Sequence, residues 1–438
     1  MTTLRRTLGA TDLTLLVIGN VIGSGIFLVP STVLKQSGSV SMALIVWLVG
    51  GVLSLFGALA YAELGAMDGS SGGLYAFTRD AFGAFPAFLY GWTLFLVIGA
   101  GTIATLAVAA ANYMGQFADL TPRMKQWIAV TLIAIMAIIN VRGTRGSASV
   151  QNWATGIKVG AILVMSGILL LAGATPEHSA RAGSIAPGVS LLSAVGTAMI
   201  SVLWAYEGWQ YVTFVAGEAI DPQRSLPRAI TSGTAALIAI YMVANLAYLA
   251  ALGPERMAAS DRVAGEAIAA VLGPWAGKAI AVAIIISMYS AAHATVITVP
   301  RVYFTMAQDG VFFARLAEVH PRYGTPAFAI VTSSIWAAVL AWSGTFEELL
   351  TYVVFIGWIF YALGAAAVIA LRRKRPNAER AFRVPGYPLT PILFVLAAIA
   401  LVGNTIVTQP AQAAKGLLIV FLGIPAYWFW NRRRHASP

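Results

Sequence analysis

The sequence has 438 residues, of which 59% are hydrophobic and only 10% are charged. Soluble globular proteins carry roughly 25% charged residues, so this composition excludes a cytosolic enzyme and a disordered chain. The 28 Lys and Arg residues exceed the 17 Asp and Glu residues and give a net charge of +11. These basic residues lie between apolar runs and form no continuous stripe, which argues against a nucleic-acid-binding domain. The composition predicts a polytopic membrane protein.

Uncharged runs long enough to cross a bilayer recur along the whole chain. A membrane-spanning helix needs about 20 apolar residues. Runs bounded by charges, Gly or Pro predict twelve spans, at 12–34, 41–64, 84–117, 126–141, 150–173, 189–216, 229–252, 277–303, 326–343, 347–371, 388–408 and 413–430. No extended loop separates them, so we expect a single all-α bundle embedded in membrane lipid.

The basic residues predict the orientation of this bundle. With twelve crossings, nineteen Lys and Arg residues fall on the side of the termini and eight on the other, while Lys158 lies inside a span. Cytoplasmic loops carry the excess of positive charge. We therefore expect both termini in the cytoplasm, and we interpret the basic run 372–375 as a topology signal.

The first predicted span contains the stretch GNVIGSGIF, Gly19–Phe27, which does not favour a continuous helix. Each interior glycine costs about 1 kcal/mol of helix stability relative to alanine, and Gly23 and Gly25 flank Ser24 directly. We therefore expect this helix to unwind here. Gly19 and Gly23, four residues apart, are also typical of close helix packing, which is the alternative interpretation.

The sixth predicted span contains WAYEGWQ, Trp204–Gln210, with an acidic residue in an apolar run. An ionised carboxylate at the bilayer centre costs at least ~2.5 kcal/mol, so Glu207 should face the bundle interior or a water-filled cavity, beside Gly208. The alternative is a structural Glu that joins two helices through hydrogen bonds.

The two irregular stretches lie five helices apart. Interrupted segments at corresponding positions of two oppositely oriented halves indicate an inverted-repeat transporter with a midplane binding site. Freed N–H groups at a helix break hold anions and freed carbonyls hold cations, so a zwitterion fits both. We expect an amino acid's carboxylate near Ser24, Gly25 and Ile26, and its ammonium near the carbonyls of Val21, Ile22 and Trp204.

Lys158 lies within the fifth predicted span, in the stretch NWATGIKVGAIL. One interpretation is a snorkelling side chain that reaches the cytoplasmic surface. The other is an ammonium fixed inside the bundle by backbone carbonyls and hydroxyls. Since buried lysines shift their pKa readily, this group is also a candidate proton carrier.

The ordered set of motifs resembles the amino acid–polyamine–organocation superfamily, and within it the bacterial relatives of the L-type amino acid transporters. The resemblance covers nearly the whole chain. It rests on GNVIGSGIF, on the motifs at Ala62–Gly83, Trp204–Gln210, Gly217–Ile230, Val302–Ile330 and Phe355–Gly364, and on FRVPGYPLTP at Phe382–Pro391.

This resemblance implies a five-plus-five inverted repeat, residues 1–173 and 189–371, followed by two helices at 388–430, working by alternating access. It implies that Gly23, Ser24 and Gly25 bind the carboxylate and that Trp204 is a gate, with Ala205, Tyr206, Glu207 and Gly208 beside it. Lys158 would replace a sodium ion by contacting the carbonyls of Gly19 and Ile22 and the hydroxyl of Ser287 or Ser290. Weaker side-chain candidates are Gly101, Thr102 and Tyr289.

Three features depart from the family pattern. Glu207 stands where the L-type pattern has a small residue, which narrows the pocket or favours positive charge. His293 stands where relatives often carry Asn, and is interpreted as a structural hydrogen-bonder or a pH sensor. The chain has no cysteine, so no disulfide-linked heavy subunit is expected.

The expected function is sodium-independent transport of small neutral L-amino acids across the plasma membrane, as an exchanger or a proton symporter. The alternatives are a transporter of cationic amino acids or polyamines with Glu207 as counter-ion, and a membrane sensor without transport. An enzyme is not expected because His178, His293, His320 and His435 lie in separate segments without ligand spacing, and we expect no cofactor or metal.

Overall fold

The structure, a computed structural model, describes residues 4–172, 191–343 and 346–436. Across these residues the regular structure is helical, apart from one isolated bridge between Leu8 and Ala219. The all-α prediction is therefore confirmed for the described chain. The α-helices are α1 (Ala10–Val21), α2 (Gly25–Ser37), α3 (Val40–Met67), α4 (Leu74–Phe82), α5 (Ala84–Thr93), α6 (Gly99–Met114), α7 (Pro122–Val141), α8 (Thr144–Ala172), α9 (Leu191–Ala205), α10 (Pro222–Ala259), α11 (Val263–Leu272), α12 (Pro274–Thr298), α13 (Pro300–Gln308), α14 (Ala327–Ser343), α15 (Phe346–Lys374), α16 (Leu389–Thr408) and α17 (Pro410–Ala436).

Long apolar helices dominate this architecture. Within the described ranges, nine helical segments are long and apolar enough to cross a membrane, and the pair α1 and α2, bent by 43°, makes a tenth. The runs expected at 189–216 and 326–343 contain α9 and α14, which are only 15 and 17 residues long. The chain is a multi-pass membrane protein.

The helices differ in detail from the expected spans. The run expected at 84–117 contains α5, a π-helical turn (Leu94–Ile98) and α6. The short helices α4 and α11 lie between expected spans and have 9 and 10 residues. Such short helices escape a search for runs of about 20 apolar residues.

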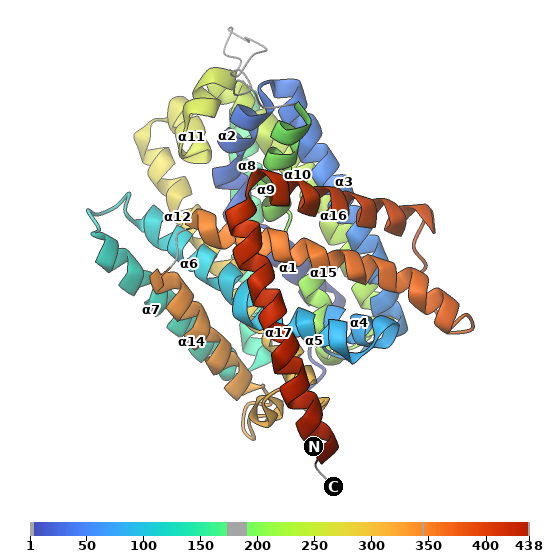
Figure 1. Ribbon diagram of the computed structural model, residues 1–438. Coiled ribbons are helices and arrows are strands. Elements are labelled where there is room, and N and C mark those ends of the chain that lie inside the picture. The colour runs from blue at the N-terminus through green and yellow to red at the C-terminus, as the bar shows by residue number, and fades with distance from the viewer. Residues whose placement is uncertain (1–3, 173–190, 344–345, 437–438) are drawn as a thin grey trace.

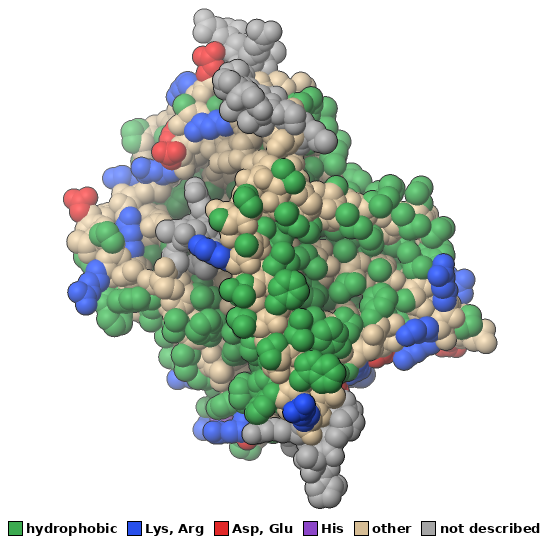
Figure 2. All heavy atoms as spheres, in the orientation of Figure 1, with side chains coloured by type: hydrophobic (Ala, Val, Ile, Leu, Met, Phe, Trp, Pro, Cys, Tyr) green, Lys and Arg blue, Asp and Glu red, His purple; other side chains and the backbone are tan. Residues whose placement is uncertain are grey.

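The exterior of the molecule is largely apolar. In Figure 1, α1 lies among the other helices, while α16 and α17 lie toward the viewer and both chain ends point to the bottom. Hydrophobic side chains cover the middle of the same view in Figure 2. Exposed side chains of α16 and α17 include Leu396, Ile399, Phe421 and Phe429. A soluble monomer rarely exposes so large an apolar surface, which agrees with contact to lipid.

Ion pairs join the helices at one end of the bundle. Arg301 and Glu218 are each 1% exposed, and Arg301 Nε donates to Glu218 Oε1 at 2.7 Å. Glu63, at the same end of α3, accepts from Arg372 at 2.6 Å. Removing one partner of a buried ion pair strongly destabilises a protein, so these contacts hold this end of the helices together.

Candidate functional site

The first expected helix break is present. Helix α1 ends at Val21, residues 22–24 are not helical, and α2 begins at Gly25. The Ser24 carbonyl accepts from the N–H groups of Phe27 and Leu28. In the described part of the chain, no backbone carbonyl accepts from the N–H groups of residues 23–26. Free amides at the start of a helix form a ready site for an anion.

The second expected break is also present and lies against the first. Helix α9 ends at Ala205, a turn covers residues 206–208, and a 3₁₀-helix follows at Trp209–Glu218. Gly208 has φ +119°, and a Cβ there would lie 3.0 Å from the backbone of Asn20. A Cβ on Gly25 would lie 2.4 Å from the Cα of Ala205. Glycine therefore permits both the turn and the close approach of the two breaks.

A small cavity lies where the breaks meet. It has a volume of about 20 Å³ and is lined by Asn20, Val21, Gly23, Ser24, Gly25, Thr102, Leu106, Trp204, Glu207 and Tyr211. This volume holds about one water molecule. An amino acid can therefore enter only if the lining helices move apart, so the structure represents a contracted form of the site.

Lys158 lies fully buried against the first break. Its Nζ donates to the carbonyl oxygens of Gly19 at 2.7 Å and Ile22 at 2.5 Å, so the side chain does not snorkel to the surface. Ser287 Oγ donates to the carbonyls of Ile22 at 3.2 Å and Gly23 at 3.1 Å. Ser290 Oγ, the alternative candidate, is buried and has no hydrogen-bond partner among the described residues. Protein donors thus occupy the Ile22 carbonyl, which was expected near the substrate ammonium.

Tyr241 of α10 joins the two breaks on another side. Its hydroxyl lies 2.9 Å from the carbonyl oxygen of Ala205 and 3.2 Å from that of Val21. These carbonyls belong to the ends of α9 and α1. A hydroxyl has one proton, so the two carbonyls share this single donor. The shared contact keeps the two helix ends close.

Glu207 lines the cavity and is 7% exposed. Its Oε1 accepts from Tyr361 Oη at 2.5 Å and from Gln210 Nε2 at 2.7 Å. The structural contact expected as an alternative is therefore made, with α15, while the residue also lies in the candidate site.

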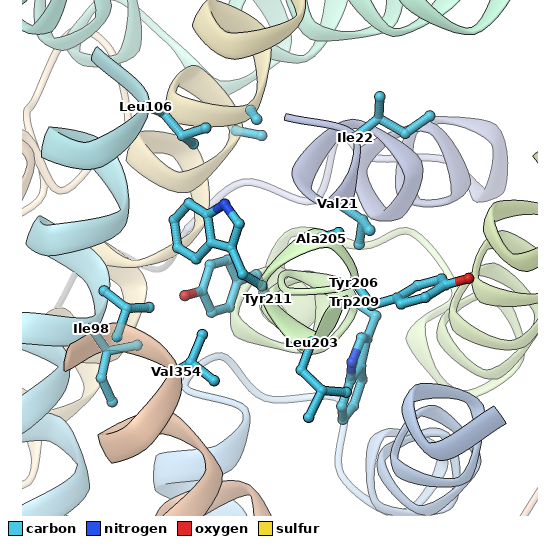
Figure 3. Close-up of a cluster of buried hydrophobic side chains, with 14 of the residues drawn as sticks. Val21, Ile22, Ile98, Leu106, Leu203, Ala205, Tyr206, Trp209, Tyr211 and Val354 are labelled. Atoms are coloured by element: carbon cyan, nitrogen blue, oxygen red, sulfur yellow. The ribbon is translucent and has the colours of Figure 1, made fainter. Parts of the chain in front are cut away.

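Trp204 closes one side of the cavity, and its Nε1 donates to Ser24 Oγ at 3.2 Å. Figure 3 shows that Tyr211 points toward Leu106 and Ile98, whereas Tyr206 and Trp209 point elsewhere. Tyr206 instead packs against Trp47 and Tyr241.

Several expected site residues do not line the cavity in this structure. They are Gly19, Ile22, Ile26, Gly101, Lys158, Ala205, Tyr206, Gly208, Ser287, Tyr289, Ser290 and His293. Gly101 serves packing instead, because a Cβ there would lie 3.0 Å from Val353.

His293 links three helices. Asn140 Nδ2 lies 3.2 Å from its Nδ1, its Nε2 lies 3.4 Å from the Ser147 carbonyl, and its ring stacks on Tyr289. An amide nitrogen is always a donor, so Nδ1 accepts and Nε2 carries the proton. This geometry agrees with the structural interpretation of His293.

Sequence reasoning missed five residues of this region, namely Asn20, Leu106, Tyr211, Tyr241 and Tyr361. Tyr211 lies four residues after Glu207, and Tyr361 lies within a motif used for the resemblance, so the usable signals were closeness in sequence to Glu207 for Tyr211 and the motif for Tyr361. Tyr241 lies in an ordinary apolar run and carries no local signal. Among the described residues, no group of three or more acidic, His or Cys side chains could hold a metal ion.

Comparison with known proteins gives a consistent relationship. Residues 8–429 match the family described as amino acid permease. The chain is 31% identical over 434 residues to the serine/threonine exchanger SteT of Bacillus subtilis, covering 98% of each chain. It is 30% identical over 428 residues to the human cystine/glutamate transporter, covering 95% of this chain and 84% of that one. It is also 30% identical over 446 residues to the rat large neutral amino acids transporter small subunit 2, covering 98% of this chain and 82% of that one.

Proposed function

The chain belongs to the amino acid permease family of the amino acid–polyamine–organocation superfamily and is related to the L-type transporters, and from this premise we propose that it is a sodium-independent exchanger of small neutral L-amino acids. The family and the relatives are membrane transporters of amino acids and not enzymes. Beyond amino acid transport, the proposal specifies small neutral substrates, exchange as the mechanism and independence from sodium.

The proposed architecture has twelve spans, with residues 1–173 and 189–371 as inverted repeats and two further helices at 388–430. The breaks between α1 and α2 and after α9 support this division, because they fall at the corresponding first span of each half. The distribution of basic residues supports an orientation with both termini in the cytoplasm, and we propose the plasma membrane as the location.

The observation that carries the proposal is the chemistry of the first break. The N–H groups of residues 23–26 have no backbone acceptor within the described chain, and they border the cavity through Gly23, Ser24 and Gly25. The substrate carboxylate binds there. Its ammonium binds the carbonyls of Val21 and Trp204, each of which accepts from one protein donor and keeps a second lone pair, whereas the Ile22 carbonyl already accepts from both Lys158 and Ser287.

Lys158 supports independence from sodium. Its Nζ occupies the carbonyls of Gly19 and Ile22, where freed carbonyls would otherwise bind a cation. A protein with its own ammonium at this position needs no sodium ion to complete the break.

Two features support alternating access, namely the contracted cavity and the ion pairs that join the helices at one end of the bundle. The cavity holds about one water molecule, so transport requires the helices to separate on one side at a time. The Arg301–Glu218 and Arg372–Glu63 pairs hold the proposed cytoplasmic side together in this form, and they must rearrange before release on that side.

The decisive experiment is uptake of labelled amino acids into proteoliposomes. Exchange predicts rapid uptake of alanine and serine only when the vesicles contain substrate, with equal rates in sodium and choline buffers. Uptake into empty vesicles driven by a pH gradient would indicate a proton symporter instead. A requirement for sodium, or no uptake of any amino acid, would refute the proposal.

A second candidate function is transport of cationic amino acids or polyamines. The observation that favours it is the Glu207 carboxylate in the cavity wall. Replacing Glu207 with Gln discriminates between the two, because this second function predicts loss of lysine uptake while alanine uptake survives. Loss of both would assign Glu207 to the framework of the site.

A further inference from the structure

The carboxylate of Glu207 is held by one oxygen. In the described part of the chain, its hydrogen bonds to Tyr361 and Gln210 both go to Oε1. Because Glu207 lines the cavity, the other oxygen is available to a molecule bound there. A carboxylate oxygen without a hydrogen-bond donor is costly in a low-dielectric site, so a ligand group that donates to this second oxygen is favoured.

The rest of the wall near Glu207 is suited to a small polar group. Tyr211 also lines this part of the cavity, and its buried hydroxyl lies near Thr102 and the Glu207 carboxylate without a well-aligned hydrogen bond to any described residue. Thr102 and Leu106 complete the same side of the cavity. A volume of about 20 Å³ leaves no room for a long side chain unless the site opens much further.

From this geometry we propose that Glu207 is a specificity-determining residue that accepts a hydrogen bond from the side-chain hydroxyl of a small amino acid substrate. Tyr361 is the positioning residue that fixes the carboxylate toward the cavity. This inference rests on the proposed function and adds how the side chain of the substrate is read. The backbone amides and carbonyls of the breaks recognise what all amino acids share, whereas Glu207 distinguishes a hydroxyl from a methyl group.

Isosteric substrate pairs test the inference directly. Serine and α-aminobutyrate differ by a hydroxyl in place of a methyl group, as do threonine and valine. A hydrogen bond to a charged acceptor favours the hydroxyl compound by about tenfold in kcat/KM. Exchange is measured in proteoliposomes loaded with alanine, for the unaltered protein and for Glu207→Gln and Tyr361→Phe.

Both variants should reduce the discrimination to about threefold or less, because a neutral or misdirected acceptor binds the hydroxyl more weakly. For Tyr361→Phe, the KM for serine should rise while the KM for α-aminobutyrate stays unchanged. A purely structural role would raise both KM values equally. Tyr248→Phe is the matched control. Tyr248 lies outside the cavity, and its buried hydroxyl has no hydrogen-bond partner among the described residues. This variant should keep the full discrimination between the substrates.

The inference is overturned if the unaltered protein distinguishes the isosteric pairs by less than twofold, or if neither variant changes the ratio. Preference for diaminopropionate over serine would also overturn it, in favour of a counter-ion role for Glu207. If a variant fails to exchange alanine, the ratio of thermal stabilisation by serine and α-aminobutyrate on the purified variant decides by the same criterion. Failure of the unaltered protein to exchange any amino acid would instead refute the proposed function.

Discussion

The two helix breaks that meet at the cavity are held by different chemistry. At the first break, Lys158 and Ser287 occupy carbonyls of residues 19–23, while the N–H groups of residues 23–26 have no backbone acceptor in the described chain. At the second break, the polar group is the side chain of Glu207, anchored by Tyr361 and Gln210. One break presents backbone donors and the other presents a side-chain acceptor.

This difference separates constant from variable recognition. Backbone groups cannot be changed by substitution, so the amides of the first break and the carbonyls of Val21 and Trp204 suit the carboxylate and ammonium that every amino acid carries. A side chain can be replaced without altering the fold, so the second break is where relatives of this chain can differ in substrate. Variants at the first break should therefore affect all substrates, and variants at Glu207 should affect some.

Loss of the Lys158 ammonium should have the largest effect. The substitution Lys158→Met retains much of the volume but leaves the buried carbonyl of Gly19 without its side-chain donor, at a cost of about 1–3 kcal/mol, and leaves the Ile22 carbonyl with Ser287 alone. We expect exchange of every substrate to fall by at least about tenfold and the thermal midpoint of the purified protein to drop. The control is Lys278→Met, at an exposed lysine of α12. A substrate-selective loss would contradict the division between the breaks.

The contact between the breaks can be tested through Gly25. In Gly25→Ala, the added Cβ would lie 2.4 Å from the Cα of Ala205, so α2 and α9 must separate. Overpacking of this kind costs about 1–3 kcal/mol, and we expect a several-fold loss of exchange for all substrates. Gly160→Ala, where nothing lies within 4 Å of the added atom, should be neutral. Equal behaviour of the two variants in exchange and thermal-shift assays would show that the contact is unimportant.

The positions of both breaks could be predicted from sequence for a physical reason. Glycines at 23, 25 and 208 weaken the helix locally, and the acidic Glu207 is costly in lipid, so both signals are local. The burial of Lys158 could be predicted in the same way, since an ammonium within an apolar run needs internal partners.

Partners contributed by distant helices could not be predicted. Tyr241 lies 220 residues from Val21, and Tyr361 lies 154 residues from Glu207. Each occurs in an apolar helix that contains one other tyrosine, Tyr248 or Tyr352, and only packing selects the one whose hydroxyl reaches a break. The Ile22 carbonyl was expected beside the substrate ammonium and, from the resemblance, also beside Lys158; in the structure Lys158 and Ser287 both donate to it.

Tyr241 should have an intermediate effect because it holds the two breaks together. Tyr241→Phe removes one hydroxyl shared by the carbonyls of Val21 and Ala205, at a cost of about 1 kcal/mol. We expect KM to rise by about fivefold for hydroxyl and methyl substrates alike. Tyr248→Phe, on the same helix with an unpartnered hydroxyl, is the control. A selective change for serine would place Tyr241 with Glu207 instead.

Ser287 should have the smallest effect, which makes it the most sensitive probe of how the first break shares its donors. In Ser287→Ala the Ile22 carbonyl keeps Lys158 at 2.5 Å, and only the Gly23 carbonyl loses its donor. We expect a KM increase of no more than about threefold, equal for all substrates, and a stability change within about 1 kcal/mol. Ser290→Ala, three residues along the same helix and without a hydrogen-bond partner, should leave both quantities unchanged. If Ser287→Ala instead reduced exchange as much as Lys158→Met, the Ser287 hydroxyl would be as important as the Lys158 side chain for the structure of the first break. The hydrogen bond to the Gly23 carbonyl would then be required for the conformational cycle.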